Sequence, residues 1–182
     1  MQKIRLNIQL QACKNIHSET RMSSYIHADM ILPRLWLGNK HASTDENFIR
    51  KNGINVVFNC TKDLPFSPLI PHQYRVPVDD NLQPAEITNM ANWAPEIMYK
   101  LMAEYKRGGV ILVHCFAGMQ RSAAVVAMFL ITLSGQSASQ VMPYIRSRRE
   151  VAFFPEANFK QSILAFEKYY YLARNSHRSG TN

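Results

Sequence analysis

Residues 110–113, Val-Ile-Leu-Val, limit the fold of this chain more than any other segment. They follow Gly108 and Gly109 and form too short a run for a helix of ordinary length, which predicts a β-strand buried on both faces. Such strands occur mainly in parallel sheets, because the helices that connect parallel strands cover both faces of the sheet. We therefore expect an α/β protein: a single domain with a mostly parallel central sheet flanked by helices.

Strand and helix patterns alternate along the rest of the chain, as this class requires. Ser43 and Glu46 form a capping box that opens a helix, and Gly53 is placed to end it. A helix over residues 84–106 is expected to bend or break at Pro95, which lacks a backbone N–H. The remaining expected elements are strands over 54–58 and 74–78 and helices from 122 onward, over 137–149 and over 158–174.

The length and composition fit one folded domain. The chain has 182 residues, 47% of them hydrophobic, which is enough for one ordinary core but too little for two. We assign residues 26–174 to the domain, 1–25 to an N-terminal arm and 175–182 to a flexible polar tail. Within the arm, residues 4–10 fit either a strand or one face of a helix. No apolar stretch reaches the roughly 18 residues that a bilayer-spanning helix needs, so we expect neither a membrane nor a secreted protein.

Net charge and cysteine content narrow the partners and the compartment. A formal charge of +8 suits an anionic partner, such as nucleic acid, an acidic membrane surface or a phosphorylated protein. No zinc-finger spacing or RNA-binding aromatic signature accompanies the charge, which disfavours nucleic acid. The chain has three cysteines, an odd number, and their spacing fits neither a disulfide framework nor a zinc site: Cys13, Cys60 and Cys115. We therefore expect no metal, a reactive thiol and a reducing compartment, cytoplasmic or elsewhere inside the cell.

The segment with the clearest chemistry lies between the buried strand and the next helix. In that setting successive backbone N–H groups can surround an anion, and the helix dipole favours negative charge. Cys115 would then be a thiolate and the nucleophile, while Arg121 could bind two phosphoryl oxygens through parallel N–H groups. Gly118 allows the loop to turn tightly. The candidate binding residues are Phe116, Ala117, Gly118, Met119, Gln120 and Arg121.

Two neighbours of this loop are expected to support it. Ser122 can donate its hydroxyl to the sulfur and stabilise the thiolate as it leaves, and His114 more plausibly orders the loop than transfers protons. A lone cysteine after an apolar strand is usually a core residue, and a cysteine six positions before an arginine often arises by chance. The catalytic interpretation of Cys115 is favoured by the strand-loop-helix setting and by three further residues of the segment, His114, Gly118 and Ser122.

Residues 114–122, with the pattern His-Cys-x-x-Gly-x-x-Arg-Ser, resemble the signature of the dual-specificity protein phosphatases. The similarity extends to residues 35–39, 56–60 and 76–80 and covers roughly residues 31–169. The resemblance implies the cysteine-phosphatase fold and no cofactor. It also implies hydrolysis of phosphotyrosine and phosphoserine/threonine in partner proteins through a cysteinyl-phosphate intermediate.

The resemblance implies further roles outside the loop. The family's general acid lies three residues after a proline, here Pro77, which selects Asp80; the chemistry of the residues alone leaves Asp79 and Asp80 equal. Arg149 stands where the family has a basic residue near the pocket, and it would either meet a second phosphate or serve as a structural arginine. Cys60 ends a strand at which some family members carry a resolving cysteine, and a small core residue is the alternative.

Other features bear on source, assembly and rival functions. Residues 152–154 and 159–160 resemble poxvirus-type members, which would imply a viral source, a nuclear or virion location and a homodimer formed through the arm. One rival function is an RNA 5′-triphosphatase or lipid phosphatase that uses the same loop; another is a non-catalytic module that binds phosphoproteins. The residues between Cys115 and Arg121 are uncharged, which argues against the first rival. Cys115, Arg121 and Asp80 are all present, which argues against the second.

Overall fold

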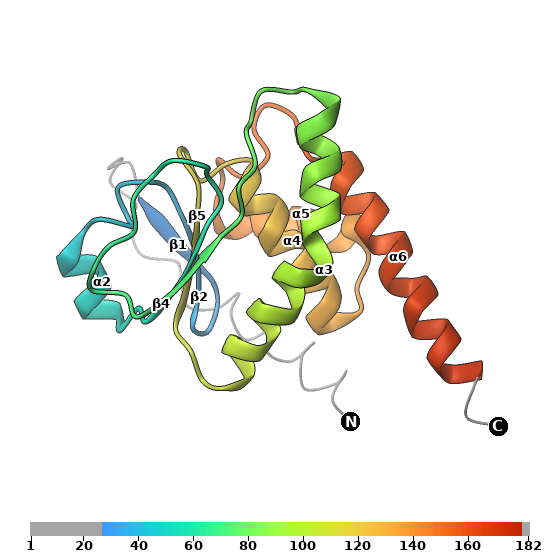
Figure 1. The fold of residues 1–182 in the computed structure, drawn as a ribbon, viewed down its shortest axis with the longest axis horizontal. Coiled ribbons are helices and arrows are strands. Elements are labelled where there is room, and N and C mark those ends of the chain that lie inside the picture. Colours follow the sequence, from blue (N-terminus) through green and yellow to red (C-terminus); the bar gives the residue numbers. More distant parts are fainter. Residues whose placement is uncertain (1–26, 180–182) are drawn as a thin grey trace.

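The computed structural model describes residues 27–179, in which strands and helices alternate along much of the chain (Figure 1). The strands are β1 (Ala28–Leu32), β2 (Leu35–Gly38), β3 (Val56–Asn59), β4 (His72–Arg75) and β5 (Ile111–His114). The helices are α2 (Glu46–Asn52), α3 (Pro84–Lys106), α4 (Arg121–Ser134), α5 (Ala138–Arg148) and α6 (Lys160–Ser179).

The strands form a five-stranded sheet in the order β1-β2-β5-β3-β4. β1 and β2 are antiparallel, and every other neighbouring pair is parallel. The expected α/β fold with a mostly parallel sheet is therefore confirmed. β5 lies at the centre, where His114 is paired with Gly38 of β2 on one side and with Asn59 of β3 on the other. The residues that follow these three strands consequently meet at one edge of the sheet, which is where ligands bind in such folds.

The two faces of the sheet bury two separate sets of side chains. Ile111 and Val113 of β5 pack into the larger core, which contains most of α4, whereas Leu112 between them packs into a smaller core beside α2. This alternation is the period-two pattern of a strand. Figure 1 shows α2 on one side of the sheet and α3, α4, α5 and α6 on the other. Residues 122–131 of α4 are all buried, so this helix is apolar around its whole circumference.

The first helix is capped differently from the prediction. Asp45 is its N-cap, and its side chain accepts the backbone N–H of Phe48 at 3.0 Å, so the predicted capping box of Ser43 and Glu46 is wrong. The Ser43 hydroxyl instead donates to the carbonyl oxygen of Lys40 at 2.8 Å. Gly53 ends the helix in the left-handed region, at φ 63°, as predicted. The capping box of Ser137 and Gln140 at α5 is also present.

Several bounds differ from the expectations. The predicted strand over 74–78 lies earlier, because β4 pairs with β3 only as far as Arg75 opposite Asn59, and the apolar residues that follow are buried in loop conformation. α3 continues through Pro95 without a break, since buried side chains on both sides of the proline hold the helix against the core. β1 was not predicted from the sequence pattern.

The ends of the chain bear on the expected arm and tail. α6 extends to Ser179, so residues 175–179 are helical, whereas a flexible tail was expected from residue 175. The arm, residues 1–25, lies outside the described residues. Among the helices of residues 27–179, none is long and apolar enough to cross a bilayer.

Candidate active site

The loop between β5 and α4 surrounds the sulfur of Cys115. This side chain is only 1% exposed, and its Sγ accepts the backbone N–H of Gly118 at 3.3 Å and the hydroxyl of Ser122 at 3.2 Å. The strand thus delivers the cysteine, and the first turn of the next helix delivers the serine. The two donors stabilise negative charge on the sulfur more than they stabilise a neutral thiol.

The electrostatic surroundings of Cys115 favour the thiolate. Burial alone would raise the pKa of this thiol, but the hydrogen bonds from the hydroxyl and backbone of Ser122, the charge of Arg121 and the backbone of Met119 outweigh burial and lower the pKa below its ordinary value. A lowered pKa increases the fraction of the nucleophilic form at neutral pH. The surroundings of Cys115 thus favour the thiolate that its position predicts, and its role as a nucleophile stays a prediction.

Gly118 is required by the tight packing of the loop. Its φ is +69°, and a Cβ at this position would collide with the backbone carbonyl of Gly38 at the end of β2. The guanidinium of Arg149 would lie 2.8 Å from the same Cβ. A side chain here would strain the backbone and also displace the loop, so glycine is the residue that fits.

Arg149 holds this loop from within the protein. Its Nε donates to the carbonyl oxygen of Gly118 at 2.7 Å, and its Nη2 lies 3.4 Å from the carbonyl oxygen of Ala117. Its Nη1 is paired with Asp29 of β1 at 2.8 Å. Because Arg149 is only 1% exposed and its guanidinium is engaged by these groups, the structure favours the structural role of the two alternatives that the sequence left open.

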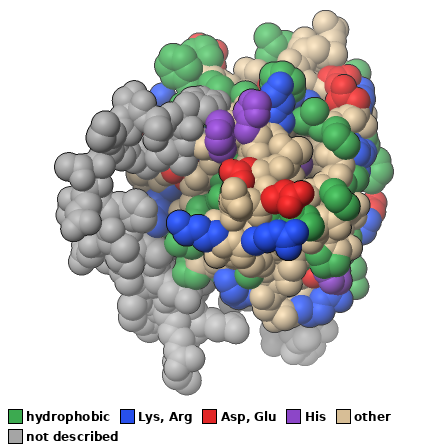
Figure 2. Space-filling model, turned by 90° about the vertical axis from the view of Figure 1, so that its left-hand side faces the viewer, with side chains coloured by type: hydrophobic (Ala, Val, Ile, Leu, Met, Phe, Trp, Pro, Cys, Tyr) green, Lys and Arg blue, Asp and Glu red, His purple; other side chains and the backbone are tan. Residues whose placement is uncertain are grey.

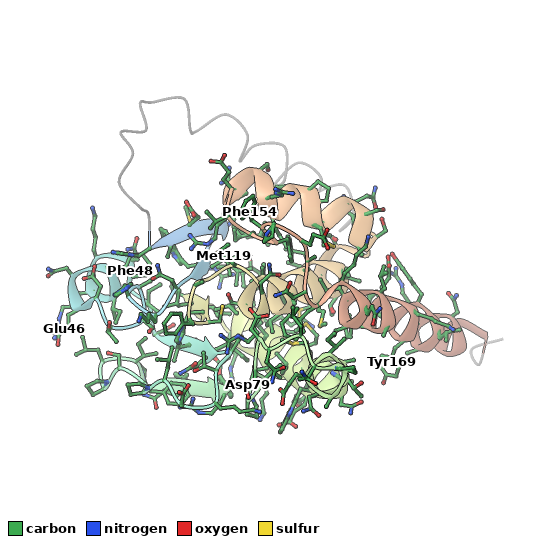
Figure 3. All side chains as sticks on the ribbon, turned by 90° about the horizontal axis from the view of Figure 1, so that it is seen from above. Glu46, Phe48, Asp79, Met119, Phe154 and Tyr169 are labelled. Atoms are coloured by element: carbon green, nitrogen blue, oxygen red, sulfur yellow. The ribbon has the colours of Figure 1, made fainter. Side chains whose placement is uncertain are left out.

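Gln120 and Asn158 connect the loop to the segment before α6. The amide nitrogen of Gln120 donates to the carbonyl oxygens of Phe154 and Glu156 at 2.9 and 2.7 Å, and its amide oxygen accepts the backbone N–H of Asn158 at 3.0 Å. Figure 3 shows Met119 and Phe154 close to each other at this contact. The side chain of Gln120 is thus occupied, which leaves its backbone to contact a ligand.

Arg121 lies at the start of α4 and retains unused hydrogen-bonding capacity. Its Nη1 donates to the carbonyl oxygen of Val78 at 3.2 Å, whereas its buried Nε has no hydrogen-bond partner within residues 27–179. A buried, unpaired donor is costly and is a common feature of binding sites. The oxygen of an anion in the loop would satisfy it.

Asp79 and Asp80 have different surroundings. The carboxylate of Asp79 is paired with Lys62 at 2.7 Å, and its backbone N–H donates to Glu86 at 2.8 Å. Asp80 is exposed, and its carboxylate accepts the side-chain amide of Asn158 at 2.7 Å. Asn158 therefore joins Asp80 to the same network that holds the loop, whereas Asp79 is directed to a neighbouring lysine.

His114 is fully buried before the cysteine. Both of its ring nitrogens lack a hydrogen-bond partner within the described part of the chain. Burial lowers its pKa to about 4, against a smaller opposing effect of the Cys115 backbone, and the charges of Arg75 and Arg121 add to the lowering. The ring is therefore neutral at neutral pH, and it supports the loop by packing.

Cys60 follows β3 as Cys115 follows β5. The preceding residues, Asn59 and His114, are direct partners in the sheet, and the backbone N–H of Cys60 donates to the carbonyl oxygen of His114 at 2.8 Å. Both cysteines are buried and free. Burial, and then the negative charge of Cys115, raise the pKa of the Cys60 thiol well above its ordinary value. Cys60 is thus a neutral thiol at the same sheet edge as the nucleophile candidate.

The structure brings most of the predicted site residues together and adds some that the sequence pattern missed. Among residues 27–179 it groups no three His, Cys, Asp or Glu side chains that could hold a metal ion. The missed residues are Asn158, which contacts Asp80, and the pair Lys62 and Glu86, which meet at 2.8 Å although they are far apart in the sequence. A long-range ion pair leaves no local pattern, so no sequence signal could have revealed it.

Comparison with known proteins gives a consistent family match. Residues 35–169 match the family model described as "Dual specificity phosphatase, catalytic domain". The chain is 28% identical over 140 residues to human "Dual specificity protein phosphatase 16", an alignment that covers 76% of this chain and 20% of that protein. It is 29% identical over 158 residues to mouse "Dual specificity protein phosphatase 2", covering 85% of this chain and 48% of that protein. The chain therefore spans less than half the length of these relatives.

A solved structure agrees with the sequence comparisons. The crystal structure of a mouse putative dual specificity phosphatase complexed with zinc tungstate superposes with a TM-score of 0.72 at 25% identity, covering 86% of this chain and 96% of that one. The relatives named here are human and mouse proteins, and they give no support to the viral source that the sequence suggested.

Proposed function

Because this chain belongs to the dual specificity phosphatase family, as the match over residues 35–169 shows, we propose that it hydrolyses phosphate esters on phosphorylated proteins, at both tyrosine and serine/threonine. The observation that carries the proposal is the sulfur of Cys115, buried at the base of the loop and hydrogen-bonded by Gly118 and Ser122. This arrangement prepares a thiolate nucleophile inside an anion-binding loop.

In the first step the Cys115 thiolate attacks phosphorus, and the ester bond to the leaving oxygen breaks. Arg121 and the backbone N–H groups of the loop bind the phosphoryl oxygens as their charge is redistributed. Asp80, in its acid form, donates its proton to the leaving oxygen, which departs as the free hydroxyl of the protein substrate. The products of this step are a cysteinyl-phosphate and an Asp80 carboxylate.

In the second step water attacks the phosphorus of the intermediate. The Asp80 carboxylate takes a proton from that water, the bond between sulfur and phosphorus breaks, and inorganic phosphate is released. The hydroxyl of Ser122, 3.2 Å from the sulfur, stabilises the thiolate that leaves. The reaction requires no metal or organic cofactor.

Phosphorylated proteins fit this site better than the rival substrates. Ala117, Met119 and Gln120 bring no charge into the loop, and the Gln120 side chain is engaged with the backbone before α6. A phosphoinositide or a triphosphorylated RNA end carries several negative charges and favours additional basic residues within the loop itself. A dependence on the reduced thiol of Cys115 also supports a reducing compartment inside the cell.

The proposal is tested by measuring phosphate release from four substrates: a phosphotyrosyl peptide, a phosphothreonyl peptide, a phosphoinositide and 5′-triphosphorylated RNA. We expect release from both peptides. Arg121→Ala should lose both turnover and binding, because the guanidinium contacts the phosphoryl group during binding and during its transfer. Hydrolysis of the RNA alone, or of the lipid alone, would contradict the assigned substrate class. Binding of both peptides without turnover by the parent chain would favour the non-catalytic module.

A further inference from the structure

A second pocket, of about 220 Å³, opens beside the candidate active site. One wall comes from the loop after β2 and contains Lys40, His41, Ser43 and Thr44, and the other comes from the segment after β3 and contains Leu64 and Pro65. β2 and β3 flank β5 in the sheet. The pocket therefore lies at the same edge as the phosphate loop, between the chain segments that border that loop on either side.

Lys40 connects this pocket to the loop of the candidate active site. Its backbone N–H donates to the carbonyl oxygen of Phe116 at 3.2 Å, and its ammonium lies 4.0 Å from the centre of the Phe116 ring. Phe116 follows the nucleophile candidate directly and is 53% exposed. Its ring and the Lys40 side chain thus lie together between the two sites, so one substrate chain could contact both.

The loop that carries the basic residues is held in a fixed conformation. Asn39 is only 1% exposed, and its side-chain oxygen accepts the backbone N–H groups of His41 and Ala42 at 2.9 and 3.1 Å. The Ser43 hydroxyl donates to the carbonyl oxygen of Lys40 at 2.8 Å. A fixed backbone lowers the entropic cost of binding, because the positions of the charged side chains are restricted in advance.

Of the six described residues that line the pocket, Lys40 alone has a side chain with a full charge at neutral pH, and that charge is positive. Lys40 supplies a cation, and the ring of His41 lies 5.1 Å from that of His27. Histidine side chains lie side by side on the face of the molecule that carries α2, as Figure 2 shows. Among the described residues that line the pocket, none is a carboxylate. The nearby Asp45 uses its side chain to cap α2.

We propose that this pocket is a specificity subsite for an anionic side chain of the substrate, a carboxylate or a second phosphate, located within a few residues of the phosphorylated residue. Lys40 is its principal charged contact, and His41 lines the pocket beside it. Leu64 and Pro65 provide an apolar wall for the methylene or methyl groups of that side chain. The inference rests on the proposed function, since it concerns substrates of the same site.

The test compares three sets of phosphotyrosyl peptides that differ at one flanking position, which carries alanine, glutamate or phosphothreonine. The position is varied over two residues on either side of the phosphotyrosine. In the parent chain, kcat/KM should be higher for an anionic residue at one or more of these positions, and the preference should shrink as ionic strength rises. A stronger preference for the glutamate peptide identifies a carboxylate as the ligand, and a stronger preference for the phosphothreonine peptide identifies a phosphate.

Lys40→Met should remove this preference. We expect kcat/KM to fall about three- to tenfold for the preferred anionic peptides, mainly through KM, and less than about twofold for the alanine peptide. Lys40→Arg should retain most of the preference because the charge is kept. Lys51→Met is the matched control: it removes the same charge from an exposed position at the end of α2, outside the pocket lining, and should leave the preference intact.

Two results would overturn the subsite. One is a parent chain that hydrolyses the alanine and anionic peptides equally well at every position. The other is a Lys40→Met variant with equal losses on all peptides, or with losses no larger than those of Lys51→Met. Either result leaves the proposed phosphatase activity intact. If the parent chain hydrolyses none of the peptides, the proposed function fails and the subsite fails with it.

Discussion

At the scale of single residues, the neighbours Asp79 and Asp80 show how partners distinguish two equal candidates. The carboxylate of Asp79 is paired with Lys62 at 2.7 Å, whereas that of Asp80 accepts the side-chain amide of Asn158 at 2.7 Å. The backbone N–H of Asn158 donates to Gln120 in the loop, so Asn158 links Asp80 to the network that holds the loop. This link favours Asp80 as the acid, the residue that the family resemblance implies, and the assignment stays a prediction.

Replacement of each aspartate tests this assignment. Asp80→Asn should lower kcat/KM, which reports formation of the intermediate, about 10²–10⁴-fold on a phosphotyrosyl peptide and much less on an activated aryl phosphate, whose leaving group needs no proton. Asp79→Asn keeps the size of the side chain and should have a mild effect on both substrates. The measurement is kcat/KM on the two substrates for each variant. A severe, leaving-group-dependent loss in Asp79→Asn together with a mild one in Asp80→Asn would reverse the assignment.

Cys60 carries a second prediction at this scale. Peroxide oxidises the Cys115 thiolate to a sulfenic acid and is reduced to water; the Cys60 thiol then attacks that sulfur, forming a disulfide and releasing water. The adjacent strand ends place both residues at one sheet edge. The raised pKa of Cys60 keeps it protonated beside a thiolate, and oxidation of Cys115 to a neutral group removes the negative charge that contributes to the raised pKa.

We expect peroxide-treated protein to yield a linked Cys60–Cys115 peptide in mass spectra and to regain activity with dithiothreitol. Cys60→Ser should recover poorly, because Cys115 then proceeds to irreversible oxidation states. Cys13→Ser serves as the control and should behave like the parent chain. If Cys60→Ser recovers as completely as the parent and no linked peptide forms, Cys60 is a core residue only.

Residue roles could be predicted from the sequence where they depend on local spacing. The positions of Cys115, Gly118 and Ser122 follow from their places between a strand and a helix, and the structure brings them into contact. The sequence could not decide between the two roles open to Arg149, because its partners, Gly118 of the loop and Asp29 of β1, are brought together only by the folded sheet. The contact of Asn158 with Asp80 could not be predicted for the same reason.

At the scale of elements, the loop from β4 to α3 is anchored where it carries the candidate acid. Lys62 lies 2.7 Å from Asp79 and 2.8 Å from Glu86, and Glu86 also accepts the backbone N–H of Asp79. The hydrogen bonds to Asp79 and Glu86 raise the pKa of Lys62, and the bond from Lys62 lowers that of Glu86. The cluster fixes the backbone immediately before Asp80, the candidate acid.

Loss of this anchor should impair proton donation more than attack on phosphorus. Lys62→Met is expected to lower kcat on a phosphotyrosyl peptide about tenfold, with a smaller effect on an activated aryl phosphate, because a misplaced acid matters only for poor leaving groups. Lys100→Met is the matched control: Lys100 forms an exposed ion pair with Glu96 at 2.6 Å within α3. Kinetics that show equal losses on both substrates, or an equal loss in the control, would reject the positioning role.

The elements were predictable to the extent that their apolar pattern is local. The bounds of α3, Pro84–Lys106, and the strand before Cys115 agree closely with the sequence pattern. The strand after β3 was misplaced, because its alternating apolar residues, Val76 and Val78, are buried by the core without strand pairing. Burial and strand pairing leave the same period-two pattern, so the sequence alone cannot separate them.

At the scale of the whole molecule, the N-terminal arm is the part of the chain that the described residues leave open. The arm contains apolar side chains that are costly to expose to water, so we predict that it packs on its own domain or on a second copy of the chain. These side chains are Ile4, Leu6, Ile8 and Leu10. Light scattering of the full chain and of a chain that starts at Tyr25 distinguishes these cases. A dimer mass for the full chain alone supports pairing through the arm, whereas two monomer masses leave only packing within one chain.

The fold class follows from a pattern that pervades the sequence, and for that reason the prediction of a parallel α/β sheet succeeded as a whole. β1, the antiparallel strand at the edge of the sheet, was missed, since the segment that forms it also contains polar residues and borders the arm. The proposed chemistry lies at the end of the central strand and requires Cys115 to form a covalent bond to phosphorus.

The most direct measurement is a rapid acid quench of the enzyme during turnover of an activated aryl phosphate, followed by mass spectrometry of its proteolytic fragments. The Asp80→Asn variant suits this experiment, because the activated leaving group needs no proton and the intermediate still forms, whereas loss of the base slows its hydrolysis. We predict a phosphoryl group on Cys115 in that variant, and none in Cys115→Ser, which should still bind a phosphotyrosyl peptide. Turnover by Cys115→Ser, or a phosphoryl group on a different residue, would contradict the account.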